Sequence, residues 1–154
     1  MLKAVFLDSS PLGLVTQRQG IALVDSCRKW VKELMDSGIQ IFVPEVADFE
    51  IRRELLRADK LSGIQRLDEF NSISVDRYVP INTDAMRRAA VIWADARNRG
   101  VPSSDVRALD ADVILAAQVL TFGLAISEIV IATSNLRHIR QYAPCELWSD
   151  IKAD

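Results

Sequence analysis

Hydrophobic and polar positions follow two alternating patterns along the chain. Short apolar runs predict β-strands at 2–7, 39–44, 78–81 and 128–133, with a further strand-like stretch at 145–148. Between them, apolar residues at helical spacing predict helices over 21–37, 45–57, 61–71, 83–99 and 110–122. The alternation predicts an α/β fold, a three-layer α/β/α sandwich around a central parallel sheet of four to five strands.

Two stretches of the chain have the composition of loops. These are SSPLG at 9–13 and VPSSDVR at 101–107. The helix expected at 45–57 takes Val46, Phe49, Ile51 and Leu55 among its apolar positions. No internal repeat or linker interrupts the 154 residues, so we expect one domain over 1–154.

Composition narrows the class of protein. Apolar residues make up 49% of the chain and charged residues 26%, as in ordinary globular proteins. A net charge of −2 argues against a protein that coats nucleic acid through bulk electrostatics. Arginine outnumbers lysine and occurs in groups, at 52–57, 87–88, 97–99 and 137–140. Guanidinium groups suit phosphate contacts, but a solvated helix face is the favoured explanation for each group taken alone.

No apolar run approaches the length needed to cross a bilayer. The chain begins directly with a strand-like segment, without the pattern of a signal peptide. We therefore expect a cytoplasmic protein with no membrane contact. Cys27 and Cys145 lie far apart and form no CxxC motif, so we expect two reduced thiols.

Acidic and amide side chains gather near the predicted carboxyl ends of the strands, where ligands bind in open parallel sheets. Hard divalent cations such as Mg²⁺ prefer oxygen ligands of this kind, and metal ions activate water for phosphodiester hydrolysis. The residues concerned are Asp8 and Ser9 after the first strand, Glu50 on the helix after the second, Asp110 and Asp112 at the start of the helix before the fourth, and Thr133 and Asn135 at its end.

Each acid also has a plainer interpretation. Asp110 serves as an N-cap, and Asp112 as an acid favoured by the helix dipole. Asp8 is a turn former at the end of a strand, and Glu50 pairs with Arg53 on a solvent-facing surface. Only the joint arrangement favours a site.

The ordered set VFLDSS, VPEVADFEIRREL, LDADVILAAQ and IVIATSNLRHI resembles a PIN domain of the VapC-like toxin-antitoxin ribonucleases. The resemblance covers essentially the whole chain. It implies a PIN-like α/β/α nuclease domain over 1–154 that uses Mg²⁺ or Mn²⁺ to cut RNA. The neutral Asn135 at the family's fourth acidic position argues against a tightly held second metal ion.

The resemblance also implies roles for individual residues. The implied catalytic residues are Asp8, Glu50, Asp112 and Asn135; the implied metal ligands are Asp8, Glu50, Asp112 and Asp110; the implied substrate-binding residues are Ser9, Thr133 and Arg53.

The implied partners are RNA, a small antitoxin protein and a second copy of the chain in a homodimer. We expect the antitoxin to dock on exposed apolar parts of the 45–70 region. A haloacid dehalogenase-type phosphotransferase fits poorly because Ser10 stands where that class needs a second aspartate. A receiver domain fits poorly because it needs an acidic pair after the first strand. The alternative that remains is a catalytically inactive PIN-like scaffold that binds RNA or protein.

Overall fold

The computed structural model describes residues 1–100 and 106–153. It contains a five-stranded, fully parallel sheet in the order β3-β2-β1-β4-β5. The strands are β1 (Ala4–Leu7), β2 (Gln40–Pro44), β3 (Tyr78–Val79), β4 (Ile129–Thr133) and β5 (Cys145–Leu147). The predicted strands and their parallel arrangement are confirmed. Residues 101–105 of the predicted loop lie outside the described residues.

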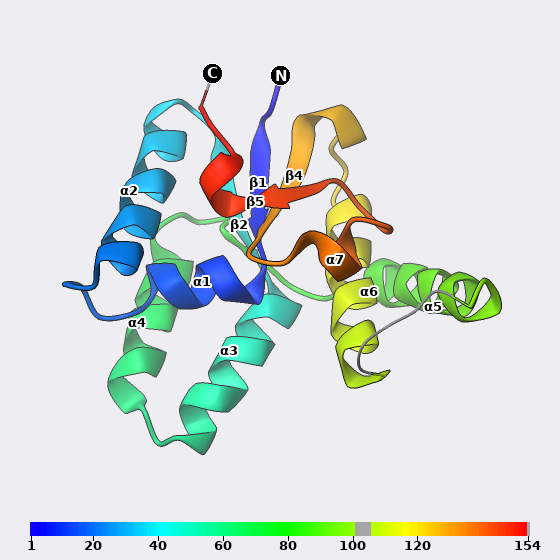
Figure 1. Ribbon diagram of the computed structural model, residues 1–154, viewed down its shortest axis with the longest axis horizontal. Helices are drawn as coiled ribbons and strands as arrows, with labels where there is room; N and C mark the ends of the chain where they lie inside the picture. The colour runs from blue at the N-terminus through cyan, green and yellow to red at the C-terminus, as the bar shows by residue number, and fades with distance from the viewer. Residues whose placement is uncertain (101–105, 154) are drawn as a thin grey trace.

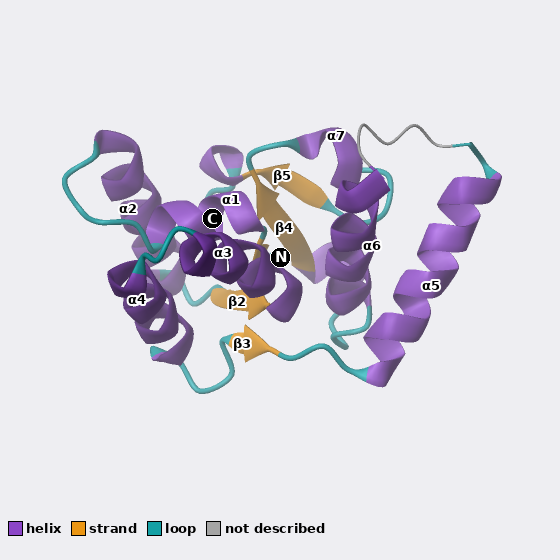
Figure 2. Ribbon diagram, turned by 90° about the horizontal axis from the view of Figure 1, so that it is seen from below, coloured by secondary structure: helices purple, strands orange, loops and turns teal. Residues whose placement is uncertain are grey.

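Helices cover both faces of the sheet and complete the predicted three-layer sandwich (Figures 1 and 2). Figure 2 shows α1 to α4 on one side of the strands, with α6 on the other side and α5 outside it. The helices are α1 (Ser9–Val15), α2 (Ala22–Asp36), α3 (Glu45–Arg57), α4 (Leu61–Ser72), α5 (Thr83–Asn98), α6 (Val106–Leu120) and α7 (Leu136–Ile139), with short 3-10 turns at Ile126–Glu128 and Trp148–Asp150.

The central strand β1 serves two hydrophobic cores, because successive side chains of a strand point to opposite faces. Val5 and Leu7 pack with α1, α2 and α4, whereas Ala4 and Phe6 pack with α6. All four residues are buried. This explains why β1 reads as a continuous apolar run rather than an alternating one.

The strand order places a switch point between β1 and β4. From β1 the chain builds outward through β2 and β3, then returns to add β4 on the opposite side of β1. Connections therefore diverge at the carboxyl ends of β1 and β4, which is where open α/β sheets bind ligands. The amide of Asp8 donates to the carbonyl of Ala132 at 2.9 Å and keeps these two strand ends together.

The predicted loop at 9–13 is wrong, because α1 begins at Ser9. The carboxylate of Asp8 accepts a hydrogen bond from the amide of Ser9 at 2.7 Å and acts as the N-cap. Pro11 lies in the first turn, where a missing N–H costs little. The serines and proline that resemble a loop are therefore a helix start.

The predicted start of α6 is also wrong. The helix begins at Val106 rather than Asp110, because Ala108 and Leu109 are strong helix formers that extend it toward its N-terminus. Asp110 and Asp112 consequently lie inside the helix. Neither the N-cap role considered for Asp110 nor the placement of both acids at the helix start is correct.

Two polar side chains fix the start of α3 relative to its neighbours. Glu45 accepts hydrogen bonds from the Tyr78 hydroxyl at 2.6 Å and from the Ile81 amide at 2.9 Å. The buried amide of Gln118 on α6 accepts from the Val46 amide at 3.2 Å and donates to the Val79 carbonyl at 2.8 Å. The bond from Val46 satisfies an N–H group that the start of α3 leaves unpaired. Together the four bonds connect α3 with α6 and with the segment at β3.

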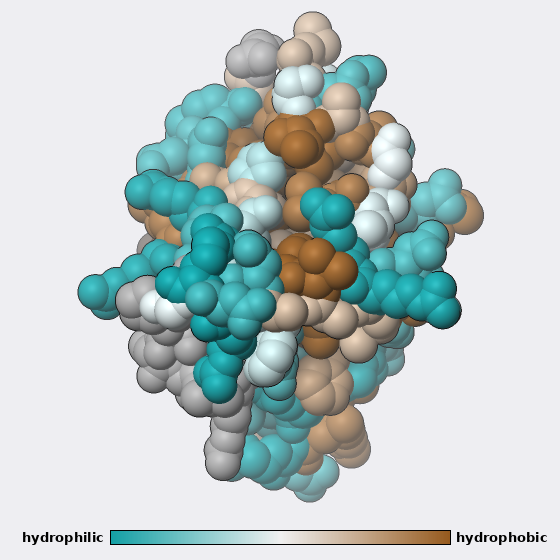
Figure 3. Space-filling view, turned by 90° about the vertical axis from the view of Figure 1, so that its right-hand side faces the viewer, coloured by the Kyte–Doolittle hydropathy of each residue, from teal (hydrophilic) through white to brown (hydrophobic). Residues whose placement is uncertain are grey.

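Apolar side chains also remain on the outer layer. Met86, Val91 and Trp93 of α5 are exposed, and Figure 3 shows apolar surface framed by polar groups on this side of the molecule. Within the described part of the chain, no helix is both long and apolar enough to cross a bilayer. Cys27 and Cys145 are free thiols, as predicted.

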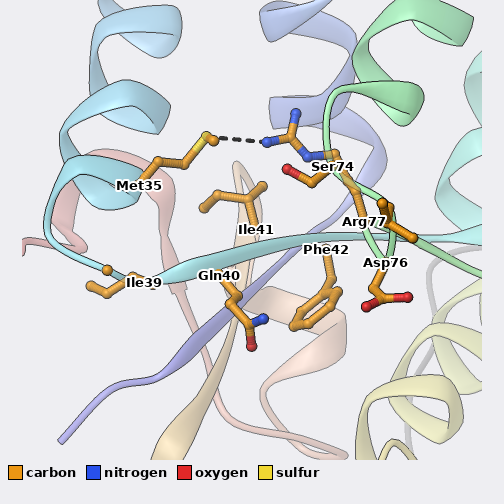
Figure 4. Close-up of a pocket in the computed structure, with 10 residues that line it drawn as sticks. Met35, Ile39, Gln40, Ile41, Phe42, Ser74, Asp76 and Arg77 are labelled. Atoms are coloured by element: carbon orange, nitrogen blue, oxygen red, sulfur yellow. Dashed lines mark hydrogen bonds between the residues drawn. The ribbon is translucent and has the colours of Figure 1, made fainter.

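Arg77 joins α2, α4 and the start of β3 from inside the protein. Its side chain is 2% exposed. It donates to the Phe70 carbonyl at 3.1 Å and to the Met35 thioether at 3.1 Å, and its guanidinium lies 4.4 Å from the centre of the Phe70 ring. Figure 4 shows it beside a cavity that Ile41 and Ser74 also line. No carboxylate of the described residues pairs with it, and burial lowers its pKa.

We expect Arg77→Ala to lower the free energy of unfolding by about 2 to 4 kcal/mol, because it leaves a cavity among three elements. Arg77→Met keeps most of the volume and removes a buried charge, so it is expected to cost less than about 1.5 kcal/mol. Urea unfolding of both variants measures this. The exposed Arg18→Ala is the control and should stay within about 0.5 kcal/mol of wild type. Equal losses in the two Arg77 variants would contradict a packing role.

Candidate active site

Asp8 lies at the switch point, where β1 ends and α1 begins. One carboxylate oxygen accepts from the Ser9 amide at 2.7 Å, and the other accepts from the Thr133 hydroxyl at 2.8 Å. Burial raises the pKa of Asp8, and the bonds from Thr133 and Ser9 oppose that rise. The carboxylate is therefore held in one orientation by groups at the ends of two neighbouring strands.

Thr133 connects Asp8 to Asn135. The buried Thr133 hydroxyl accepts a hydrogen bond from the Asn135 amide at 3.1 Å while it donates to Asp8. The exposed Asn135 side chain accepts from the Arg137 amide at 3.0 Å and caps α7. The sequence analysis predicts that Thr133 binds substrate and that Asn135 is a catalytic residue. The contacts seen here give Thr133 a positioning role and leave the Asn135 side-chain nitrogen directed to no described partner.

The acids of α3 divide into structural groups and one candidate. Asp48 is 4% exposed and accepts from both Arg52, at 2.8 and 3.0 Å, and Asn71, at 2.8 Å. Glu54 pairs with Arg57 at 2.9 Å on the surface. Among the described hydrogen bonds and ion pairs, none involves the Glu50 carboxylate. Glu50 is therefore the acid of α3 that we consider as a candidate functional residue.

Three carboxylates from separate elements influence one another electrostatically. Burial and the charge of Asp8 raise the pKa of Glu50, while Arg53 lowers it. Burial, Asp8 and Glu50 together raise the pKa of Asp112 to about 7. The three carboxylates thus lie within range of one another's charge, and their common role as a site stays a prediction. Figure 1 shows α1, α3 and α6 around the lower end of β1. Asp8 is the N-cap of α1, Glu50 lies on α3 and Asp112 lies on α6.

Asp110 does not join these three acids. Two residues along a helix differ by about 200° in direction, so Asp110 and Asp112 occupy different sides of α6. Asp110 instead lines a groove between α5 and α6 with Met86 and Trp93. The predicted metal role of Asp110 therefore has no support in its position, and we leave it out of the ligand set considered below.

The chemistry of Asp8, Glu50 and Asp112 suits a hard divalent cation, because carboxylate oxygens are the ligands that Mg²⁺ and Mn²⁺ favour. A nearby positive charge would relieve the repulsion that raises the pKa of Asp112. As these side chains stand, no group of three or more His, Cys, Asp and Glu residues in the described ranges is arranged as a metal site. Metal binding stays a prediction.

The residues assigned to substrate have different positions. Ser9 contributes its amide to Asp8 and is half-buried. Arg53 is exposed, and its guanidinium lies 5.2 Å from the centre of the Phe49 ring. Phe49, one of the apolar positions of the predicted helix, is 56% exposed, whereas Val46 one turn earlier is buried. Helical spacing alone does not separate these two positions.

Comparison by sequence finds no relatives: no family model matches the chain, and no curated protein matches it. Comparison by structure finds similar chains. A chain of VapBC2 from Rickettsia felis, solved with a DNA fragment from its promoter, superposes with a TM-score of 0.70 at 11% identity, covering 94% of this chain and 98% of that one.

Two further solved structures agree. A chain of FitAcB from Neisseria gonorrhoeae gives a TM-score of 0.66 at 14% identity, covering 96% of this chain and 99% of that one. A chain of DNA-bound VapBC from Salmonella typhimurium gives 0.62 at 19% identity, with the same coverage of 96% and 99%. At such identities the likeness establishes the fold. The chain has the fold of a VapC-like PIN domain.

Proposed function

We propose that the chain is a Mg²⁺- or Mn²⁺-dependent endoribonuclease and the toxin of a type II toxin-antitoxin pair. The observation that carries the proposal is the mutual charge interaction of Asp8, Glu50 and Asp112 at the switch point of the sheet. Clustered carboxylates with raised pKa values at the ligand-binding edge of a fold are typical of a functional site. The structural neighbours, which are toxin-antitoxin complexes, support the same reading.

In this proposal Asp8, Glu50 and Asp112 hold the cation directly or through water, and Asn135 completes the surroundings. When bound, the ion lowers the pKa of a water and neutralises charge on the phosphate. Thr133 and the Ser9 amide keep the Asp8 carboxylate oriented. Such supporting bonds to a ligand are worth about 10- to 100-fold in metal affinity or activity.

We further propose a small antitoxin as the partner. Leu56 of α3 and Leu61 of α4 are exposed, and they belong to the 45–70 region where the sequence predicts docking. When a partner helix covers exposed apolar side chains of this kind, their burial stabilises the complex. Co-expression with the product of a neighbouring gene, followed by purification of the pair, tests this proposal.

An inactive scaffold is the competing function. Like charges in a partly buried cluster destabilise a fold unless a cation or a proton neutralises them. A scaffold that binds no metal ion has no use for this destabilising cluster, whereas a metal-dependent nuclease needs the carboxylates as cation ligands. Calorimetric titration with Mn²⁺ separates the two, since a scaffold has no reason to bind the ion at these carboxylates.

We expect Asp112→Asn to raise the stability of the metal-free protein above neutral pH. The folded-state pKa of Asp112, about 7, lies above its value of 3.8 in an unfolded chain. Folding therefore favours the protonated form, and its stabilising effect is lost as the pH rises from about 4 through 7. The gain at pH 8 should be on the order of 1 to 2 kcal/mol after solvent screening. Urea unfolding at pH 4 and pH 8 measures it.

Asp48→Asn is the matched control. Asp48 is an acid with cationic and amide partners, so its replacement should destabilise the protein at pH 8. A wild-type protein whose unfolding free energy does not fall between pH 4 and pH 8 relative to Asp112→Asn would contradict the charge cluster.

We expect Asp8→Asn and Asp112→Asn to reduce RNA cleavage by roughly 100-fold or more, because each removes a charged cation ligand worth several kcal/mol in the transition state. Cleavage of a panel of RNAs with Mn²⁺ measures the rate, and the thermal shift on adding Mn²⁺ measures binding. Thr133→Ser keeps the hydroxyl and should retain activity, whereas Thr133→Val should lose about 10- to 100-fold. Full activity in both aspartate variants would remove them from the mechanism.

A homodimer is the remaining proposal, and the groove between α5 and α6 supports it. Met86, Trp93, Val113 and Ile114 line this groove, and the first two are exposed. We expect wild-type protein to sediment as a dimer and Trp93→Asp as a folded monomer, because a buried carboxylate opposes association. Ile126→Asp, at an exposed apolar position elsewhere, should remain dimeric. A monomeric wild type contradicts the proposal.

A further inference from the structure

An aromatic side chain and an arginine form an exposed stacked pair beside the carboxylate cluster. The Arg53 guanidinium lies 5.2 Å from the centre of the Phe49 ring, and both residues are on the solvent side of α3. Phe49 immediately precedes Glu50 in the sequence. Arg53 lies one helical turn after Glu50, at i+3, so the pair occupies the part of α3 that carries the proposed metal ligand.

The fold does not depend on this pair. Phe49 is 56% exposed and belongs to neither main hydrophobic core. A cation–π contact at an exposed position contributes only about 0.5 to 1 kcal/mol. The ring is therefore not needed for packing and is accessible to a ligand that approaches α3 from solvent.

Arg53 is also the arginine of α3 that no carboxylate holds. Arg52 pairs with Asp48 and Asp68, and Arg57 pairs with Glu54. Among the ion pairs of the described residues, Arg53 appears in none. Its charge nevertheless lowers the pKa of Glu50, which places the guanidinium near that carboxylate. A positive charge here offsets the repulsion that an acidic site exerts on a phosphate backbone.

We propose that Phe49 and Arg53 form a stacking platform for one base of a single-stranded RNA, next to the phosphate that Asp8, Glu50 and Asp112 address. The inference rests on the proposed ribonuclease function and deepens it. Aromatic rings and guanidinium planes are the groups on which proteins stack unpaired bases, without regard to sequence.

The surroundings of Phe49 favour RNA over a protein segment. A docked helix needs several apolar anchors at neighbouring positions of the surface. The helical neighbours of Phe49 at i+3 and i+4 are Arg52 and Arg53, so guanidinium groups, not apolar side chains, lie between Phe49 and Leu56 of the proposed antitoxin surface. A single aromatic ring among guanidinium groups suits a base and its phosphates.

The test measures RNA affinity without cleavage. Fluorescence anisotropy of a short fluorescein-labelled oligoadenylate is recorded with Ca²⁺ in place of Mg²⁺. Phe49→Ala is expected to weaken binding about 5- to 100-fold, the range that loss of one stacking residue produces. Phe49→Trp should bind at least as tightly as wild type. Phe49→Leu keeps apolar area without a flat ring, so it should weaken binding as Phe49→Ala does.

Leu23→Ala is the matched control, since Leu23 is 54% exposed and lies on a different helix, α2. It should leave RNA affinity unchanged. A scan with abasic nucleotides adds a position-specific test: at one position, loss of the base and Phe49→Ala should not be additive. Wild-type affinity in Phe49→Ala or in Phe49→Leu would overturn the platform and leave the residue to a protein partner.

Different results would overturn the ribonuclease proposal and the stacking-platform proposal. RNA cleavage by wild type with Mg²⁺ is measured in parallel. Absence of cleavage together with affinity that depends on Phe49 would overturn the nuclease and support an RNA-binding platform. Cleavage by wild type together with unchanged affinity in Phe49→Ala would overturn the platform alone.

Discussion

The burial of three carboxylates in one region is the constraint on which the switch point of the sheet depends. Asp8, Glu50 and Asp112 come from a strand end and two helices, and burial, followed by the charges of Asp8 and Glu50, raises the pKa of Asp112 to about 7. Left free, such side chains would turn toward water and separate. The fold prevents this because each is attached to an element that is fixed elsewhere: Asp8 by Thr133 and the Ser9 amide, α3 by Glu45 and Gln118.

Packing in the interior holds the backbone on which Asp8 stands. β1 is buried on both faces and lies between β2 and β4, so the end of β1 has little freedom to move. Packing at this density resists displacement of a backbone by even a fraction of an ångström. The sheet thus holds in place carboxylates whose charged forms are unfavourable there. Unfavourable local arrangements are common where proteins bind ligands and catalyse reactions.

The same helix carries structural and candidate functional acids within ten residues. Glu45 and Asp48 are occupied by hydrogen bonds to Tyr78, Arg52 and Asn71, and Glu54 pairs with Arg57. Glu50 is within range of the charges of Asp8 and Arg53, and Arg53 also contacts the exposed Phe49 ring. α3 therefore combines three roles, and its helical periodicity separates them in space although they adjoin in sequence.

The sequence alone determined the order of the elements, the parallel sheet and the acids at its edge. Buried parallel strands read as continuous apolar runs, so β1, β2 and β4 were predicted with boundaries close to those observed. The start of α6 and the helix α1 were not, since Ser, Pro and Asp serve loops and helix starts alike.

Only the tertiary structure decided which acid belongs to which task. Composition gives Glu45, Asp48, Glu50 and Glu54 the same chemistry, and their partners come from α4 and β3 as well as from α3 itself. Asp110 likewise differs from Asp112 because the packing of α6 against α5 places Asp110 in the groove between these two helices. Local pattern fixes which side chains exist along an element, but packing against distant segments fixes what each of them meets.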